Sequence, residues 1–433
     1  MSAIIDKLVK KQFVKNVIIL VTGTAAGQFL NLVFQPIITR LYGPEAYGTM
    51  GAFIALIGII TPIAALTYPI AIVLPKKDEE ARNLVRLSLL FTLIFSLILL
   101  IMIVFLKNQL ATLLNLGEVA KYLLLFPIVI LFAGIVQVLE QWLIRTKEFP
   151  INAKATFYQS LILNITKVGA GLVYPFAVVL VFLSAIANGI RATLMFILIR
   201  KKHRKKSLKF WREKVNIQEY KGLVKKYKDF PIYRAPQSLI FAITESLPLL
   251  MLSMFFGPAA AGFYSLSRSV MSVPSQLIGK AVGDVFYARI SDAGNRNENL
   301  TSLIFKATIA LAGIALVPFG LVVIIGPWLF SLVFGQSWYT AGEYAQWVAL
   351  YVFFKFIHQP SMKALPVLNA QAFHLKFTII TLILNLITMS TGYYIFQSDI
   401  LAISFFALSN SLLSIFLIFF TIKLSKRFDS KAT

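Results

Sequence analysis

Apolar stretches separated by short polar segments follow one another from one end of the chain to the other. Each stretch holds about 20 residues or more, enough to cross the ~30 Å hydrocarbon core of a bilayer as a helix. Twelve spans are predicted, at 16–40, 49–74, 84–106, 121–144, 152–174, 176–199, 231–256, 259–287, 300–326, 341–367, 373–396 and 400–423. The pattern predicts an all-α polytopic membrane protein.

Basic residues mark every second connection between these spans. Lysines and arginines precede the first span and follow the second, fourth and last, whereas the opposite connections carry little beyond Lys107 and Lys121. Loops rich in lysine and arginine stay in the cytoplasm. Both termini are therefore predicted to be cytoplasmic, which requires an even number of spans.

One long polar segment, residues 200–230, lies near the midpoint of the chain and is strongly basic. It divides the chain into an N-terminal lobe at 1–199 and a C-terminal lobe at 231–433. Its apolar residues recur at helical spacing, at Ile217, Tyr220, Val224 and Tyr227. This spacing is compatible with a helix on the membrane surface, but the favoured interpretation is a solvated linker between the lobes. Its expected partner is anionic phospholipid rather than nucleic acid.

A short motif occurs once in each lobe, after the first predicted span of six. It reads aromatic-Gly-Pro-x-Ala-x-Gly, with Gly43, Pro44 and Gly48 in the first copy and Gly257, Pro258 and Gly262 in the second, 214 residues later. Gly and Pro predict a tight turn, and the last glycine predicts close helix packing. The repeat predicts two six-helix lobes related by a pseudo-two-fold axis along the membrane normal, as in alternating-access transporters.

Composition narrows the possible chemistry. Of the 433 residues, 58% are hydrophobic and only 14% are charged, which excludes an ordinary water-soluble enzyme. The absence of cysteine excludes disulfides, iron–sulfur clusters and thiol catalysis. The three histidines are scattered, so no metal site and no cofactor are expected.

Polar side chains recur at helical spacing inside several spans, where they are costly unless they face a bundle interior or a wet cavity. The candidate substrate-binding residues are Gln28, Asn31, Gln35, Lys167, Arg234, Glu245, Arg268, Ser272, Ser275, Gln276 and Lys355. Arg268 is expected to be an unpaired cation that lines a hydrated cavity with Arg234 and Gln28, although Arg234 begins its span and an interfacial anchor is the alternative for it. Asn385 and Asn410 are expected to form interhelical hydrogen bonds.

Cations outnumber acids among these intramembrane groups. Lysine and arginine recognise phosphate through charge-assisted hydrogen bonds, and the arginine fork does so bidentately. The excess therefore predicts an anionic substrate, such as a phosphate or pyrophosphate. In the tenth span, Trp347, Tyr351 and Lys355 share one face, and aromatic rings beside a cation form a plausible platform for a sugar.

The segment from Phe34 to Gly48, FQPIITRLYGPEAYG, and the later AIVLP at Ala71–Pro75 resemble bacterial polysaccharide flippases. These are the O-antigen and capsule exporters of the multidrug/oligosaccharidyl-lipid/polysaccharide superfamily, and Arg40 matches a basic position in their motif. The resemblance covers the whole chain in span count, repeat and linker, but only the first 75 residues are specific in sequence.

The resemblance implies a transporter rather than an enzyme. Its implied substrate is an undecaprenyl-pyrophosphate-linked oligosaccharide repeat unit, moved across the bacterial inner membrane during lipopolysaccharide or capsule synthesis. Polysaccharide polymerase and chain-length machinery are candidate partners, and H⁺ or Na⁺ coupling stays open.

Two other functions compete with this interpretation. A multidrug cation antiporter of the same architecture would need carboxylates in its cleft, and only Glu245 is well placed. A membrane enzyme of polysaccharide assembly usually requires a sizeable outer loop or a catalytic domain with paired acids. The one long loop of this chain is basic instead.

Overall fold

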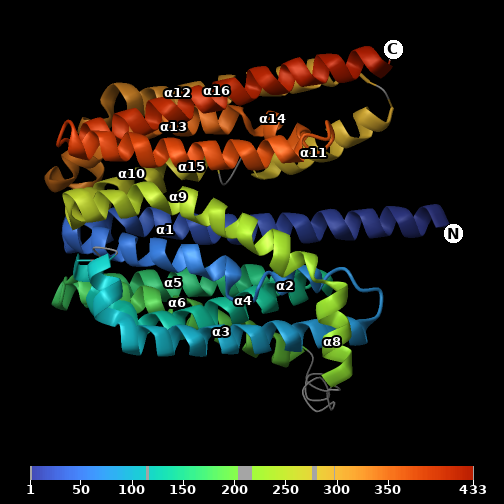
Figure 1. The fold of residues 1–433 in the computed structure, drawn as a ribbon, viewed down its shortest axis with the longest axis horizontal. Coiled ribbons are helices and arrows are strands. Elements are labelled where there is room, and N and C mark those ends of the chain that lie inside the picture. The colour runs from blue at the N-terminus through green and yellow to red at the C-terminus, as the bar shows by residue number, and fades with distance from the viewer. Residues whose placement is uncertain (1, 114–116, 203–216, 276–279, 297, 433) are drawn as a thin grey trace. The chain divides into compact units, whose positions relative to one another are not determined.

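The computed structural model describes the backbone at residues 2–113, 117–202, 217–275, 280–296 and 298–432. Side chains are described over 25–109, 119–202 and 218–275, and over 286–430 except at 288, 295 and 297. Helices account for nearly all of these ranges, and no strand occurs in them (Figure 1). The chain groups into two compact units, residues 1–42 with 53–242 and residues 43–52 with 243–433.

The long helix α1 (Ser2–Ile60) belongs to unit 1, apart from its residues 43–52, which belong to unit 2. The helix α3 packs on α4, α4 packs on α6, and α6 packs on α5. The bounds are α2 (Tyr68–Ala71), α3 (Asp78–Leu113), α4 (Phe126–Arg145), α5 (Phe149–Val173), α6 (Ala177–Lys202), α8 (Ile217–Lys226) and the first residues of α9 (Ala235–Phe256).

Unit 2 is built around α13, which packs against α10, α12 and α16, while α15 packs on α16. The bounds are α10 (Pro258–Pro274), α11 (Lys280–Asn295), α12 (Leu300–Phe334), α13 (Tyr339–Ile357), α14 (Gln359–Ala364), α15 (Gln371–Tyr394) and α16 (Asp399–Ala432). Most of α9 also belongs to this unit.

Each of the twelve predicted spans overlaps at least one helix in the described part of the chain, although the first two both overlap α1 and the span 259–287 is divided between α10 and α11. Within that part, eight helical stretches are long and apolar enough to cross a membrane, and the first of them, Ala25–Ile63, contains the kink at Gly43. The helices α5, α10 and α13 fall outside this set. They carry Lys167, Arg268 and Lys355, and α10 is also short, with 17 residues.

Prolines end or break helices where the apolar pattern predicted continuous spans. In the predicted span 49–74 the long helix α1 ends at Ile60, a 3₁₀ turn containing Pro62 follows, and only the short helix α2 comes after it. The predicted span 341–367 divides into α13 and α14 just before Pro360. A proline lacks the backbone N–H and clashes with the preceding turn. Hydropathy reports the apolar length of a segment, and it does not report such a break.

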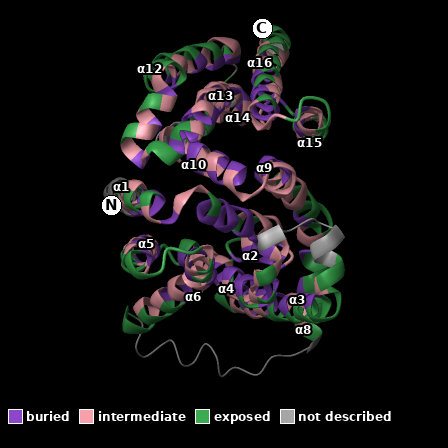
Figure 2. Cartoon of the chain, turned by 90° about the vertical axis from the view of Figure 1, so that its left-hand side faces the viewer, coloured by how far each residue is buried: buried purple, intermediate pink, exposed green. Residues whose placement is uncertain are grey.

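Large apolar side chains are exposed along the outer faces of several helices. On α3 they include Leu97, Ile98 and Phe105, and on α12 Val317 and Ile324. Green, exposed segments recur along α12 and α16 in Figure 2. Soluble monomers rarely expose continuous apolar surface of this extent. These faces are therefore lipid-facing, as expected of a multi-pass membrane protein.

The two copies of the repeated turn pack against each other inside unit 2. Gly43 and Gly257 both have positive φ, 70° and 89°, which glycine adopts without strain. A Cβ atom on Gly48 would lie 1.7 Å from the carbonyl oxygen of Pro258, and one on Gly262 would lie 2.1 Å from that of Pro44. The predicted turn and the predicted close packing are both confirmed, and the close contact is between the copies.

The C-terminal part of the predicted linker is a helix anchored to unit 1. Leu223 in α8 and Tyr227, the residue after it ends, are buried against a core that includes Ile72, Leu84 and Val138. Lys226 forms an ion pair with Glu80 on α3. Val224, from the same set of predicted apolar positions, is exposed. Residues 203–216 of the linker lie outside the described ranges, and the lobe boundaries at 199 and 231 stay a prediction.

Candidate functional site

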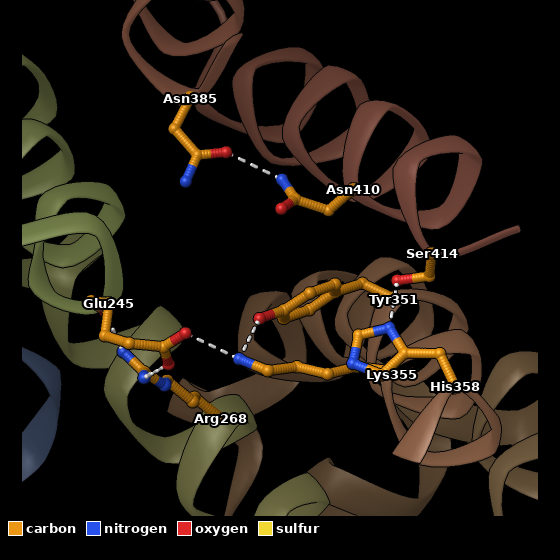
Figure 3. A network of polar contacts seen from close by, with 8 residues as sticks. All are labelled: Glu245, Arg268, Tyr351, Lys355, His358, Asn385, Asn410 and Ser414. Carbon is orange, nitrogen blue, oxygen red and sulfur yellow. Dashed lines mark hydrogen bonds and ion pairs between the residues drawn. The ribbon is translucent and has the colours of Figure 1, made fainter. Parts of the chain in front are cut away.

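Three charged side chains from three helices of unit 2 meet at one carboxylate. Glu245 lies on α9, Arg268 on α10 and Lys355 on α13 (Figure 3). The Glu245 Oε2 atom accepts from Arg268 Nη2 at 2.7 Å, and Oε1 accepts from Lys355 Nζ at 2.6 Å. We call these three residues the charge cluster.

Each cation of the charge cluster has a second contact that holds it in place. Arg268 Nη1 donates to the backbone carbonyl of Glu245 at 2.5 Å, within the turn of α9 that precedes Pro248. Lys355 Nζ donates to the Tyr351 hydroxyl at 2.7 Å and lies 5.3 Å from the centre of that ring. The spacing of Tyr351 and Lys355, four residues apart on one helix, makes this contact possible.

The cluster carries a formal charge of +1, because two cations share one carboxylate. The side chains of Glu245, Arg268 and Lys355 are 26%, 33% and 32% exposed. They therefore lie at an accessible surface of unit 2. An intramembrane site with excess positive charge and accessible guanidinium and ammonium donors is suited to bind an anion.

The expectation that Arg268 is an unpaired cation is wrong, because Glu245 neutralises part of its charge. The sequence marked both residues as candidates, but it gave no signal that they meet. Of the other candidates on α10, Ser272 Oγ donates to the Ser269 carbonyl at 2.9 Å. The Ser275 hydroxyl is buried and has no hydrogen-bond partner in the described part of the chain. Gln276 lies outside the described residues.

Two further polar pairs of unit 2 are drawn with the charge cluster in Figure 3. His358 is buried one turn beyond Lys355, and its Nδ1 atom lies 3.0 Å from Ser414 Oγ on α16. Asn410 Nδ2 donates to Asn385 Oδ1 at 2.7 Å, so the two residues form the expected interhelical hydrogen bond with each other, between α15 and α16. Among the described residues, no group of histidine, aspartate and glutamate side chains could hold a metal ion.

The candidate residues of unit 1 are dispersed. Asn31 is exposed and accepts a 2.7 Å hydrogen bond from Asn164 on α5, while Gln35 is buried. Lys167 is partly buried, and its backbone carbonyl accepts from the Tyr42 hydroxyl at 2.8 Å.

The remaining candidates of unit 1 are exposed, namely Gln28, Arg40 and Arg234. Arg234 ends the π-helical turn Phe230–Arg234. The role of all the unit 1 candidates in binding stays a prediction.

Unit 1 has an ion pair that the sequence did not indicate. Arg191 on α6 contacts Glu140 on α4, and its Nη2 atom also donates to Asn152 Oδ1 at 3.0 Å. Here one carboxylate faces one cation, so the formal charge is zero. We interpret this neutral pair as a structural contact between α4 and α6, in contrast to the cationic cluster of unit 2.

Comparison with known proteins assigns the family. The sequence profile of the family described as "Polysaccharide biosynthesis protein" matches residues 37–343, well over half of the chain. No curated protein matches the chain in sequence.

Solved structures match the fold over almost the whole chain. An inward-facing multidrug resistance MATE family transporter of the MOP superfamily aligns with a TM-score of 0.71 and 15% identity, covering 92% of this chain and 96% of that one. The lipid II flippase MurJ, in an inward closed conformation, aligns with a TM-score of 0.69 and 13% identity, covering 97% and 90%.

A MOP superfamily transporter from Pyrococcus furiosus, described as having a binding pocket of reverse polarity, aligns with a TM-score of 0.62 and 14% identity, covering 95% and 96%. The likeness to the MATE and MurJ structures confirms the predicted all-helical polytopic fold class. The chain therefore belongs to the polysaccharide biosynthesis protein family and has the helical fold of MOP superfamily transporters.

Proposed function

We propose that this chain is a flippase for undecaprenyl-pyrophosphate-linked oligosaccharide repeat units in the bacterial inner membrane. The observation that carries the proposal is the charge cluster, in which Arg268 and Lys355 converge on one carboxylate and leave a net positive charge at membrane depth. The family supports a role in polysaccharide synthesis. The fold shared with a lipid II flippase supports a lipid-linked substrate.

In this mechanism the chain binds and moves its substrate without making or breaking a covalent bond. The pyrophosphate binds to Arg268 and Lys355 by charge-assisted hydrogen bonds, and the sugars lie against polar faces of the spans. The prenyl tail stays in the lipid. Alternating access then exposes the head group outside, and an inside-negative potential favours this by about 2.3 kcal/mol per net negative charge per 100 mV.

The charge cluster disfavours a multidrug cation antiporter, although a MATE transporter shares the fold. A cationic drug needs an accessible carboxylate, but Glu245 is bound by two cations. A drug would have to displace both of them and would be repelled by them. A membrane enzyme is less well supported, because the structures similar in fold are transporters.

Purified full-length protein should bind the diphosphate head group. Undecaprenyl pyrophosphate at 100 times its Kd stabilises the protein by about 2.7 kcal/mol, so the thermal midpoint should rise in its presence. Undecaprenol, which lacks the charged head, and the cationic dye ethidium serve as controls. Equal stabilisation by undecaprenol, or stabilisation by ethidium alone, would contradict the proposed substrate class.

We expect both termini and the linker 200–230 to be cytoplasmic, because the basic connections then lie inside. Reporter fusions at Lys206 and at the C-terminus should both report cytoplasm. A periplasmic signal from either fusion would overturn this topology. In the cytoplasm, the basic linker would contact anionic phospholipid, and a polymerase would consume the flipped unit on the opposite side.

A further inference from the structure

We propose that Glu245 is an internal counter-anion that occupies the diphosphate site of the empty transporter and is displaced when substrate binds. This inference rests on the proposed function, because it concerns the same two cations. It adds a regulatory step: the Glu245 carboxylate competes with the substrate for Arg268 and Lys355.

The Glu245 carboxylate contacts the two cations in the way that a bound anionic ligand would. Its two oxygens accept from two different cations, Arg268 at 2.7 Å and Lys355 at 2.6 Å. A phosphate group presents oxygens to arginine and lysine in a similar way. The carboxylate therefore lies where an anionic head group would obtain the same two partners.

Both cations stay positioned when the carboxylate leaves. Arg268 keeps its hydrogen bond to the backbone carbonyl of Glu245, and Lys355 keeps its hydrogen bond to Tyr351. The exposed fraction of the Glu245 side chain, 26%, gives the carboxylate an accessible surface toward which it can move. The site is thus built to exchange one anion for another without losing its two donors.

The exchange has an electrostatic reason. Two unpaired cations at membrane depth are costly, so an internal carboxylate stabilises the empty site. A diphosphate carries more negative charge and more acceptor oxygens than one carboxylate, and a guanidinium has five N–H donors to offer it. The cluster keeps a net positive charge while Glu245 is bound to both cations, and this charge still attracts a diphosphate.

The Glu140–Arg191 pair of unit 1 is a matched control. Glu140 is 29% exposed and contacts one arginine, which also donates to Asn152. Removing the charge of Glu140 frees a single cation outside the proposed site. It should have no effect on diphosphate binding if the effect of Glu245 is specific.

Direct binding of inorganic pyrophosphate to the full-length protein in nanodiscs tests the competition. The Glu245→Gln variant should bind the probe about tenfold more tightly or better than the wild type, a difference of one decade in Kd. Glu140→Gln should bind it as the wild type does. Glu245→Asp keeps the charge on a shorter side chain and should give an intermediate affinity, and it serves if Glu245→Gln does not fold.

Glu245 variants that bind pyrophosphate no more tightly than the wild type would overturn the inference, as would equal tightening by Glu140→Gln. Failure of the proposed function looks different. In that case undecaprenyl pyrophosphate would not stabilise the wild type, or it would stabilise Arg268→Ala equally. Wild-type binding that depends on Arg268, with no gain in the Glu245 variants, would leave the function standing and remove only the competition.

Discussion

Replacing Arg268 by alanine is expected to lower glycan export about 100-fold or more, to the background of the assay. Arg268→Ala removes one of the two cations and leaves Lys355 paired with Glu245, so the formal charge of the cluster falls from +1 to zero. Hydrogen bonds to charged groups contribute about 1.5–3 kcal/mol each, and two of them correspond to a factor of about 100 or more. Export of surface glycan in cells that depend on this chain measures the effect.

Protein amount and membrane insertion of Arg268→Ala should match the wild type, because Lys355 still neutralises Glu245. Arg268→Lys should restore part of the export, since it keeps the charge but lacks the bidentate fork. Arg289→Ala is a control, because Arg289 forms an exposed pair with Glu298 outside the predicted spans. Full export by Arg268→Ala would remove the basis for the site.

The largest effect on stability is expected at the contact between the two repeated turns. Gly48→Ala would place a Cβ atom 1.7 Å from the Pro258 carbonyl oxygen, and Gly262→Ala would place one 2.1 Å from the Pro44 carbonyl oxygen. These are backbone atoms, so the helices must move apart. Overpacking of this kind costs about 3 kcal/mol, which should lower the thermal midpoint by about 5 °C or more.

Gly313→Ala on α12 is the matched control, because a Cβ atom there has no neighbour within 4 Å. Alanine should be neutral or stabilising at that helical position. At Gly43 and Gly257 space is free, but positive φ should cost about 1–2 kcal/mol for alanine. Thermal midpoints of Gly48→Ala and Gly262→Ala equal to that of the wild type would contradict the close contact.

The fold could be predicted from sequence because its main determinant, apolar length, is local. Spans, alternation of basic loops and the turns at Gly43 and Gly257 all follow from residues that are neighbours in the chain. The apolar pattern did not show the breaks after Ile60 and before Pro360, since a helix broken by proline is as apolar as a continuous one; Pro62 in the sequence indicated bending at the first of them. The contact between the two turns was also missed. The motif shows that each helix needs a glycine for close packing, but it does not show which segment packs there.

For the site, the sequence predicted which residues take part but not how they contact one another. Helical spacing placed Arg268 and Lys355 on polar faces. The requirement to satisfy buried amides predicted interhelical hydrogen bonds for Asn385 and Asn410, which prove to bond with each other. The pairing of Arg268 with Glu245 depends on how α9, α10 and α13 lie side by side. No residue pattern within one helix encodes that arrangement.

Flipping of the lipid-linked substrate by the purified chain tests the central claim most directly. Proteoliposomes would carry a labelled undecaprenyl-pyrophosphate-linked oligosaccharide, and its movement between leaflets would be followed by access of a membrane-impermeant quencher. The account predicts flipping well above that of protein-free liposomes with the wild type, and flipping at the protein-free rate with Arg268→Ala. Flipping by the wild type at the protein-free rate, or equal flipping of a lipid with an uncharged head group, would contradict it.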